Sequence, residues 1–206
     1  MRVYNILLTG VGGQGILLGG DILSRAALME GLDVKKAETH GMAQRGGSVV
    51  THIRLGKKVL SAMVPTGSAD LLVSFELLEA LRHAHYVKDR GTIVYSTRRF
   101  DPLPVLRGED VYPTPKAIQE ALRRIRYVAD VDAESLAIEA GHPLTQNVVM
   151  IGAASTRLPI SVESLREAVA VSVKRAKEAN LKAFELGRKA VEARLPSATP
   201  ALKIRK

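Results

Sequence analysis

Two glycine-rich segments hold the residue types that could do chemistry in this chain. The first reads GVGGQG over residues 10–15 and lies between an apolar run and a segment with helical spacing. Its glycines match the G-x-G-x-x-G pattern, with one additional glycine at position 13. Such glycines let the backbone approach a ligand closely, and the N–H groups that open the following helix attract an anion. The segment therefore predicts an anionic or nucleotide-like ligand; a tight turn that only packs helix on strand is the alternative.

The second segment reads ETHGMAQRGGSVV over residues 38–50 and joins two predicted strands. Glu38 follows the last glycine of the first segment by about 20 residues, where a dinucleotide-binding fold carries an acidic residue for a ribose. Arg45 could bind phosphate or carboxylate through two parallel N–H donors. Open α/β sheets bind ligands at one edge, so we expect both segments to emerge there from neighbouring strands and to share a site. The alternative is a glycine-rich loop with a solvated Arg45.

Strands and helices must position these two segments. The apolar pattern predicts that strands alternate with helices along the chain. Strands are predicted over residues 3–9, 33–38, 48–54, 58–63, 69–74, 91–96 and 127–131. Helices are predicted over residues 16–30, 76–84, 116–124, 133–140 and 147–154, then after Ser161 and through Ala183 and Phe184. The proline-rich residues 101–115 are expected to form an irregular excursion.

This order predicts an α/β fold, namely a Rossmann-like three-layer sandwich with a largely parallel sheet and a helical C-terminal end. We expect residues 1–195 to form a single domain and residues 196–206 to form a flexible basic tail. The helix over residues 147–154 is expected to be buried and to pack closely through Gly152.

The composition excludes several kinds of site. The chain has 206 residues and no cysteine. It cannot by itself build a disulfide, a thiolate zinc site, a cysteine nucleophile or a cysteine-ligated iron–sulfur cluster. Its five histidines form no H-E-x-x-H helix, and His83 and His85 are too closely spaced to share a helix face. We therefore expect no metal site and assign no catalytic residue.

The net charge of +9 raises nucleic acid as a partner, but the distribution of charge argues against it. Basic residues are spread along the chain and alternate with glutamates in the C-terminal helical region, and aromatic residues make up only 4%. We expect a solvated or subunit-facing basic surface and no nucleic-acid partner. The apolar runs fall far short of the roughly 20 residues of a membrane helix. We expect no membrane association and a cytoplasmic location.

Three motifs together resemble the small, beta- or gamma-type subunit of the 2-oxoacid:ferredoxin oxidoreductases: GVGGQG, ETHGMAQRGGSV and LTQNVVMIGA. The similarity extends over roughly residues 3–190 and is closest to the indolepyruvate type. It implies a Rossmann-like domain in a larger assembly. It also implies a large partner subunit that carries thiamine diphosphate and the iron–sulfur clusters. The assembly would oxidatively decarboxylate an aryl 2-oxoacid to its acyl-CoA, with coenzyme A as co-substrate, and reduce ferredoxin.

The resemblance assigns this chain a supporting part, because the sequence lacks cluster ligands and a GDG-to-Asn thiamine diphosphate pattern. No cofactor is expected on the chain alone, although the corresponding domain of pyruvate-type relatives helps to position coenzyme A. Candidate cofactor-binding residues lie in the three motifs. They are Gly10, Gly12, Gly13, Gln14, Gly15, His40, Gln44, Arg45, Gly46, Gly47 and Asn147.

The sequence is compatible with other functions. The chain could be a pyruvate-type gamma subunit or a non-catalytic module for nucleotide binding or assembly, and it could form a homodimer when isolated. A free-standing NAD-dependent dehydrogenase is a further alternative, but 206 residues leave little space for a second catalytic domain.

Overall fold

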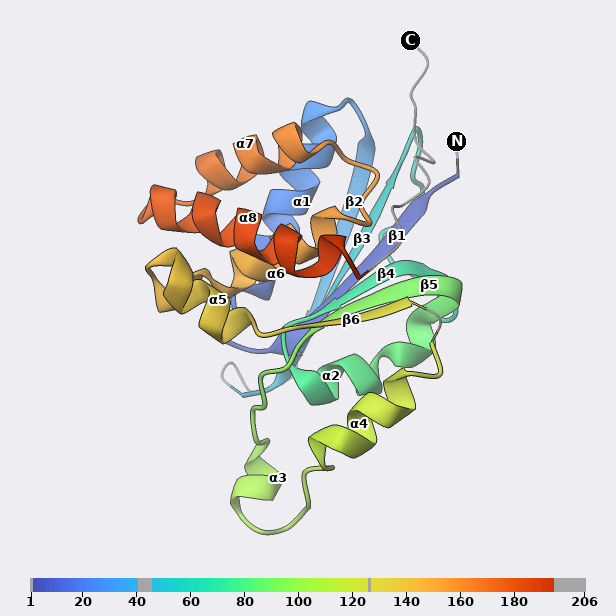
Figure 1. The fold of residues 1–206 in the computed structure, drawn as a ribbon. Coiled ribbons are helices and arrows are strands. Elements are labelled where there is room, and N and C mark those ends of the chain that lie inside the picture. Colours follow the sequence, from blue (N-terminus) through green and yellow to red (C-terminus); the bar gives the residue numbers. More distant parts are fainter. Residues whose placement is uncertain (1, 41–45, 126, 195–206) are drawn as a thin grey trace.

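The computed structural model describes residues 2–40, 46–125 and 127–194. A six-stranded sheet lies between two layers of helices, as Figure 1 shows. This arrangement confirms the predicted α/β fold. The predicted tail over residues 196–206 lies outside the described residues, as do Gln44 and Arg45.

The strands and helices follow the predicted alternation closely. The strands are β1 (Tyr4–Val11), β2 (Asp33–His40), β3 (Ser48–Gly56), β4 (Ala69–Ser74), β5 (Val87–Ser96) and β6 (Tyr127–Val131). The first helices are α1 (Ile16–Met29), α2 (Leu77–Arg82), α3 (Leu103–Leu106) and α4 (Pro115–Leu122). They are followed by α5 (Ala133–Ala140), α6 (Gln146–Ser155), α7 (Val162–Ser172) and α8 (Lys177–Glu192), and the short 3₁₀ turns are η1 (Ala84–Tyr86) and η2 (Pro143–Thr145).

The sheet has the strand order β2-β3-β1-β4-β5-β6. Strands β1, β4, β5 and β6 pair in parallel, whereas β3 is antiparallel to both of its neighbours. The prediction of a largely parallel sheet is therefore confirmed, since β3 alone among the described strands runs against the others. All parallel strands end at one edge of the sheet, and the glycine-rich residues 10–15, called the glycine turn below, lie at this edge.

The predicted strand over residues 58–63 is wrong. This part of the described chain forms no strand, because its polar backbone groups are bonded to side chains instead of to a neighbouring strand. Val59 donates its N–H to the Asp33 carboxylate at 2.7 Å. Arg54 donates to the carbonyls of Ser61 and Met63.

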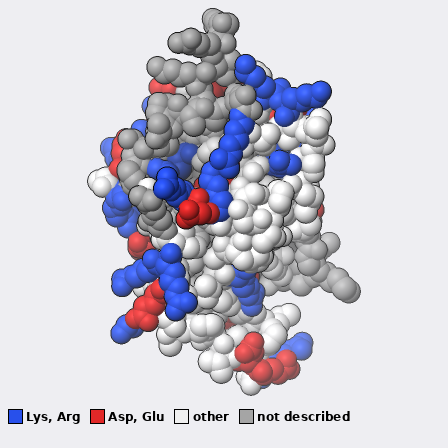
Figure 2. Space-filling model, turned by 90° about the vertical axis from the view of Figure 1, so that its right-hand side faces the viewer, with Lys and Arg blue, Asp and Glu red and all other residues white. Residues whose placement is uncertain are grey.

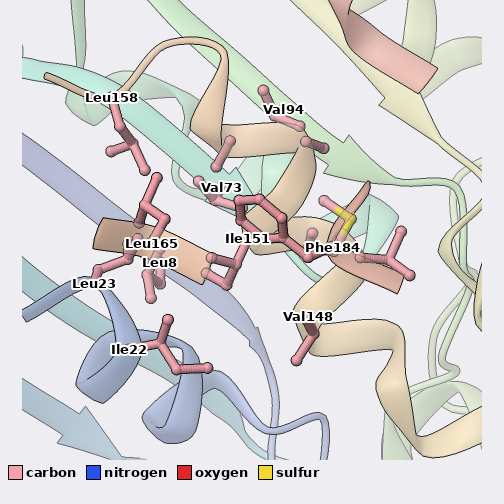
Figure 3. Packing of buried hydrophobic residues seen from close by; sticks show 14 of the residues in the cluster. Leu8, Ile22, Leu23, Val73, Val94, Val148, Ile151, Leu158, Leu165 and Phe184 are labelled. Carbon is pink, nitrogen blue, oxygen red and sulfur yellow. The ribbon is translucent and has the colours of Figure 1, made fainter. Parts of the chain in front are cut away.

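The larger part of the core lies between the sheet and helices α1, α5, α6, α7 and α8. Figure 3 shows its members from both layers, including Leu8 of β1, Ile151 of α6 and Phe184 of α8. Helix α6 is buried from Asn147 to Ser155, as predicted. A Cβ atom on Gly152 would lie 2.0 Å from the Phe184 carbonyl oxygen, so the backbones of α6 and α8 are in contact.

The opposite face of the sheet is covered by α2 and α4, whereas α3 projects away from the body in Figure 1. Helix α3 lies within the excursion that the prolines predict. On the face shown in Figure 2, Lys and Arg side chains are scattered among uncharged and acidic residues. Within the described part of the chain, no helix is both long and apolar enough to cross a membrane.

Candidate functional site

The glycine turn joins the end of β1 to the start of α1. Gly13 and Gly15 have φ angles of +100° and +75°, which residues with a side chain rarely adopt. Gln14 closes the turn, because its Oε1 accepts from the Val11 N–H at 2.7 Å and its Nε2 donates to the Phe75 carbonyl at 3.0 Å. The turn is therefore fixed both to its own strand and to the end of β4.

The start of α1 offers backbone donors. The first intrahelical bond runs from the Gly19 N–H to the Gly15 carbonyl at 3.0 Å, so the N–H groups of residues 16–18 precede it. In the described chain, Gly15 provides no side-chain cap and the first turn contains no acidic residue. A Cβ atom on Gly13 would meet no described atom within 4 Å. This combination of open space and uncapped donors suits an anion.

The end of the second glycine-rich segment lies beside this turn. The Gly12 N–H donates to the Gly47 carbonyl at 2.9 Å. Gly46 has a φ angle of +80°, and a Cβ atom there would lie 3.6 Å from Cε1 of Phe100. His40 ends β2 in register with Val49. The structure thus brings Gly46 and Gly47 to the turn, whereas Gln44 and Arg45 lie outside the described residues.

The expected origin of the two segments is corrected in one respect. Strands β1 and β2 are not neighbours, because β3 lies between them and pairs with both. The second segment reaches the turn through the start of β3, where Ser48 pairs with Val11. Glu38 therefore lies two strands away from the turn, and its carboxylate forms an ion pair with Lys36 at 2.8 Å. The order removes the basis for the expected ribose contact, which requires the second strand beside the first.

Asn147 brings α6 to the same place. It is almost completely buried, and its Nδ2 lies 3.5 Å from the Gly15 carbonyl oxygen. A Cβ atom on Gly15 would lie 2.7 Å from this Nδ2, so only a glycine fits here. Asn147 also accepts the Val148 N–H at 2.9 Å. Its amide thus fixes the first turn of α6 against the start of α1.

The sequence interpretation missed two residues at this edge. Arg98 follows β5 and donates to Gln146 Oε1 at 2.6 Å, next to Asn147. Glu76 follows β4, and its buried Oε1 accepts from the Phe100 N–H at 3.0 Å and from the Tyr112 hydroxyl at 2.6 Å. The position of both residues directly after parallel strands was the signal that could have found them.

A hollow of about 460 Å³ opens next to Leu18 of α1 and Asn147 of α6. It lies between the first turns of α1 and α6 and the connection from α7 to α8. Its lining residues are Leu18, His142, Leu144, Thr145, Asn147, Ser172, Val173, Lys174, Arg175, Ala176 and Asn180. Within the described chain, no group of three or more His, Cys, Asp or Glu side chains could hold a metal ion.

Comparison with known sequences gives relatives over most of the chain. The model of the family described as pyruvate ferredoxin/flavodoxin oxidoreductase matches residues 5–190. Indolepyruvate oxidoreductase subunit IorB of Pyrococcus horikoshii is 44% identical to this chain. The match covers 93% of this chain and 98% of that protein. The same subunit of Thermococcus kodakarensis is 43% identical with the same coverage. The common subunit gamma of the Pyrococcus furiosus pyruvate/ketoisovalerate oxidoreductases is 26% identical, covering 78% of this chain and 81% of that protein.

Solved structures share the fold. The gamma subunit of a keto/oxoacid ferredoxin oxidoreductase from Geobacter sulfurreducens has a TM-score of 0.68 and 22% identity, covering 92% of this chain and 99% of that chain. A chain of the 2-oxoglutarate:ferredoxin oxidoreductase from Magnetococcus marinus has a TM-score of 0.72 and 23% identity. The match covers 97% of this chain and 32% of that chain, so the fold occurs there as part of a longer polypeptide.

Proposed function

Because the chain belongs to the pyruvate ferredoxin/flavodoxin oxidoreductase family, we propose that it is the small subunit of an indolepyruvate-type 2-oxoacid:ferredoxin oxidoreductase. Membership in a 2-oxoacid:ferredoxin oxidoreductase complex follows from the matches over nearly the whole chain. The indolepyruvate type is supported by 44% identity to an indolepyruvate subunit, against 26% to a pyruvate/ketoisovalerate subunit. The proposed reaction converts an aryl 2-oxoacid and coenzyme A to an acyl-CoA and carbon dioxide, with electrons passing to ferredoxin.

We assign thiamine diphosphate and the iron–sulfur clusters to the larger partner subunit. This chain does not fit the clusters, because it has no cysteine to ligate them. Thiamine diphosphate, when bound to the partner, would supply the electron sink for decarboxylation. The part proposed for this chain is to provide an anion-binding edge beside that active site.

The glycine turn is the proposed anion site, and the phosphates of coenzyme A are its proposed ligand. Three features support this assignment: uncapped N–H groups at the start of α1, open space beside Gly13, and the Gly46–Gly47 backbone next to Gly12. A helix N-terminus carries partial positive charge, and a ligand held by backbone donors needs no catalytic side chain. The turn would therefore bind and orient the co-substrate and take no part in proton transfer.

Gly12→Val tests the ligand role of the turn. Gly12 is absent from the glycines with positive φ, so the substitution does not force the backbone strain expected at Gly13 or Gly15. The N–H that bonds to Gly47 is also retained. We expect the added side chain to obstruct the ligand and to lower kcat/KM for coenzyme A at least about tenfold in the assembled complex. Steady-state kinetics gives the readout, and thermal unfolding of the isolated variant confirms that it folds. Gly12→Ala should give a smaller loss, and wild-type kinetics in a folded valine variant would refute the ligand role.

Arg45 is proposed to assist the turn as a bidentate clamp for phosphate or carboxylate. Arg45→Lys keeps the charge but loses the planar fork, so we expect kcat/KM to fall several-fold, and further in Arg45→Ala. Kinetics with varied coenzyme A and varied 2-oxoacid identifies which substrate is affected. Arg25→Lys, at an exposed position on α1, is the control and should match the wild type. Unchanged kinetics in Arg45→Ala would mean that this arginine is merely solvated.

A further inference from the structure

Helix α2 carries two buried acidic side chains. Glu76, which caps the start of the helix, and Glu79 are each 1% exposed, although the helix begins at the edge of the sheet that carries the glycine turn. Burial of a carboxylate costs several kcal/mol of hydration free energy, which hydrogen bonds and opposite charges must compensate. Apolar residues in their place would often give an equally stable protein. The hydrogen-bond partners of the two carboxylates therefore indicate the role of these residues.

The partners of Glu79 lead to the glycine turn. Its Oε2 accepts from the Ser48 hydroxyl at 2.5 Å, and its Oε1 accepts from Arg82 at 2.7 Å. The imidazole of His83 lies 3.6 Å from Oε2. Ser48 directly follows Gly47, whose carbonyl accepts the Gly12 N–H. A continuous set of contacts therefore runs from a buried carboxylate on α2 to the backbone of the turn.

Glu76 holds the opposite side of the same site. It bonds to the N–H of Phe100, and the Phe100 ring lies against Gly46. Its second oxygen accepts the Glu79 N–H at 2.9 Å, which fixes the two acidic residues relative to each other. Gly46 and Gly47 are thus flanked by the Phe100 ring, whose backbone N–H bonds to Glu76, and by the Ser48 hydroxyl, which bonds to Glu79.

We propose that Glu79 is a positioning residue that, through Ser48, holds Gly47 against Gly12 and so sets the shape of the anion site. Arg82 complements its charge and the His83 imidazole lies beside it, so the carboxylate can remain buried while one oxygen is directed to the loop. The positioning is a property of the fold. Its effect on substrate binding rests on the proposed function of the glycine turn.

Ser48→Ala is the sharpest variant, because it removes only the contact to the loop and leaves Glu79 with Arg82 and His83. The direct readout is amide hydrogen exchange of Gly12 in the full chain, which needs no ligand and no partner. We expect exchange at Gly12 to become at least about tenfold faster, since a hydrogen bond to a charged group is lost. Ser48→Thr retains a hydroxyl and should restore the slow exchange. Glu79→Gln provides a second variant with the same expected direction.

Thr39→Ala is the matched control. Its hydroxyl lies on β2 near the same edge, and among the described residues its bond is a long one of 3.4 Å to the Val50 carbonyl. The control should leave Gly12 exchange unchanged. Unchanged Gly12 exchange in both Ser48→Ala and Glu79→Gln would overturn the proposal.

The assembled complex tests the consequence for function. We expect Ser48→Ala to raise the KM for coenzyme A several-fold with kcat nearly unchanged, and Ser48→Thr to restore it. A general loss of folded subunit would instead lower the rate at every coenzyme A concentration, and that result would count against positioning. Faster Gly12 exchange with wild-type kinetics would support the structural clamp and refute the proposed ligand role of the turn, so the two failures are distinguishable.

Discussion

Replacing Gly152 with alanine is expected to lower the free energy of unfolding by about 3 kcal/mol or more. The added Cβ would lie 2.0 Å from the Phe184 carbonyl oxygen. A Cβ atom added to Gly187 on α8 would in turn lie 1.9 Å from the Val149 carbonyl oxygen of α6. The obstructing atoms belong to the backbone, so no side-chain rotation can relieve the overlap. Helices α6 and α8 would have to separate, and Phe184 would lose contacts in the core.

Chemical denaturation of the full chain measures this effect. Gly19→Ala is the control, because its Cβ would meet the flexible end of Ile151 at 3.3 Å and alanine favours the helix. We expect this control to change stability by less than about 1 kcal/mol. Gly187→Ala should resemble Gly152→Ala. A Gly152→Ala protein as stable as the Gly19→Ala protein would contradict the backbone contact between the two helices.

The isolated chain is expected to show no oxidoreductase activity, and activity should be restored on addition of the partner subunit. Ferredoxin reduction requires one-electron carriers, and a chain without cysteine cannot ligate an ordinary iron–sulfur cluster. Decarboxylation requires an electron sink that protein side chains supply poorly. The difference between the lone chain and the complex should therefore be the largest change in activity predicted for this protein.

Purification of each polypeptide alone, followed by reconstitution, provides the measurement. Each sample is assayed with an aryl 2-oxoacid, coenzyme A and an electron acceptor, and its visible absorbance is recorded. We expect a colourless small subunit with no turnover. A brown small subunit or substantial turnover from it would refute the division of roles, and so would a partner that is fully active alone. A panel of 2-oxoacids on the complex tests the indolepyruvate type.

The sequence by itself determined the features that depend on local spacing and composition. The alternation of strands and helices follows from apolar patterns with periods of two and 3.6 residues, which neighbouring side chains define. The glycine turn and the close contact at Gly152 are also visible in the sequence, since few residues other than glycine fit where backbones meet. The lack of cluster ligands follows directly from the absence of cysteine.

Only the tertiary structure decided which of these elements lie side by side. The apolar pattern of β3 does not specify which strands it pairs with. In the structure β3 pairs with both β1 and β2, and its position between them separates Glu38 from the turn. Residues 58–63 have the composition of a strand, but the Asp33 carboxylate, distant in sequence, bonds to Val59. Glu79 likewise reads as an ordinary helix residue until folding brings Ser48 to its carboxylate. Such contacts join residues far apart in the chain, so local propensity does not encode them.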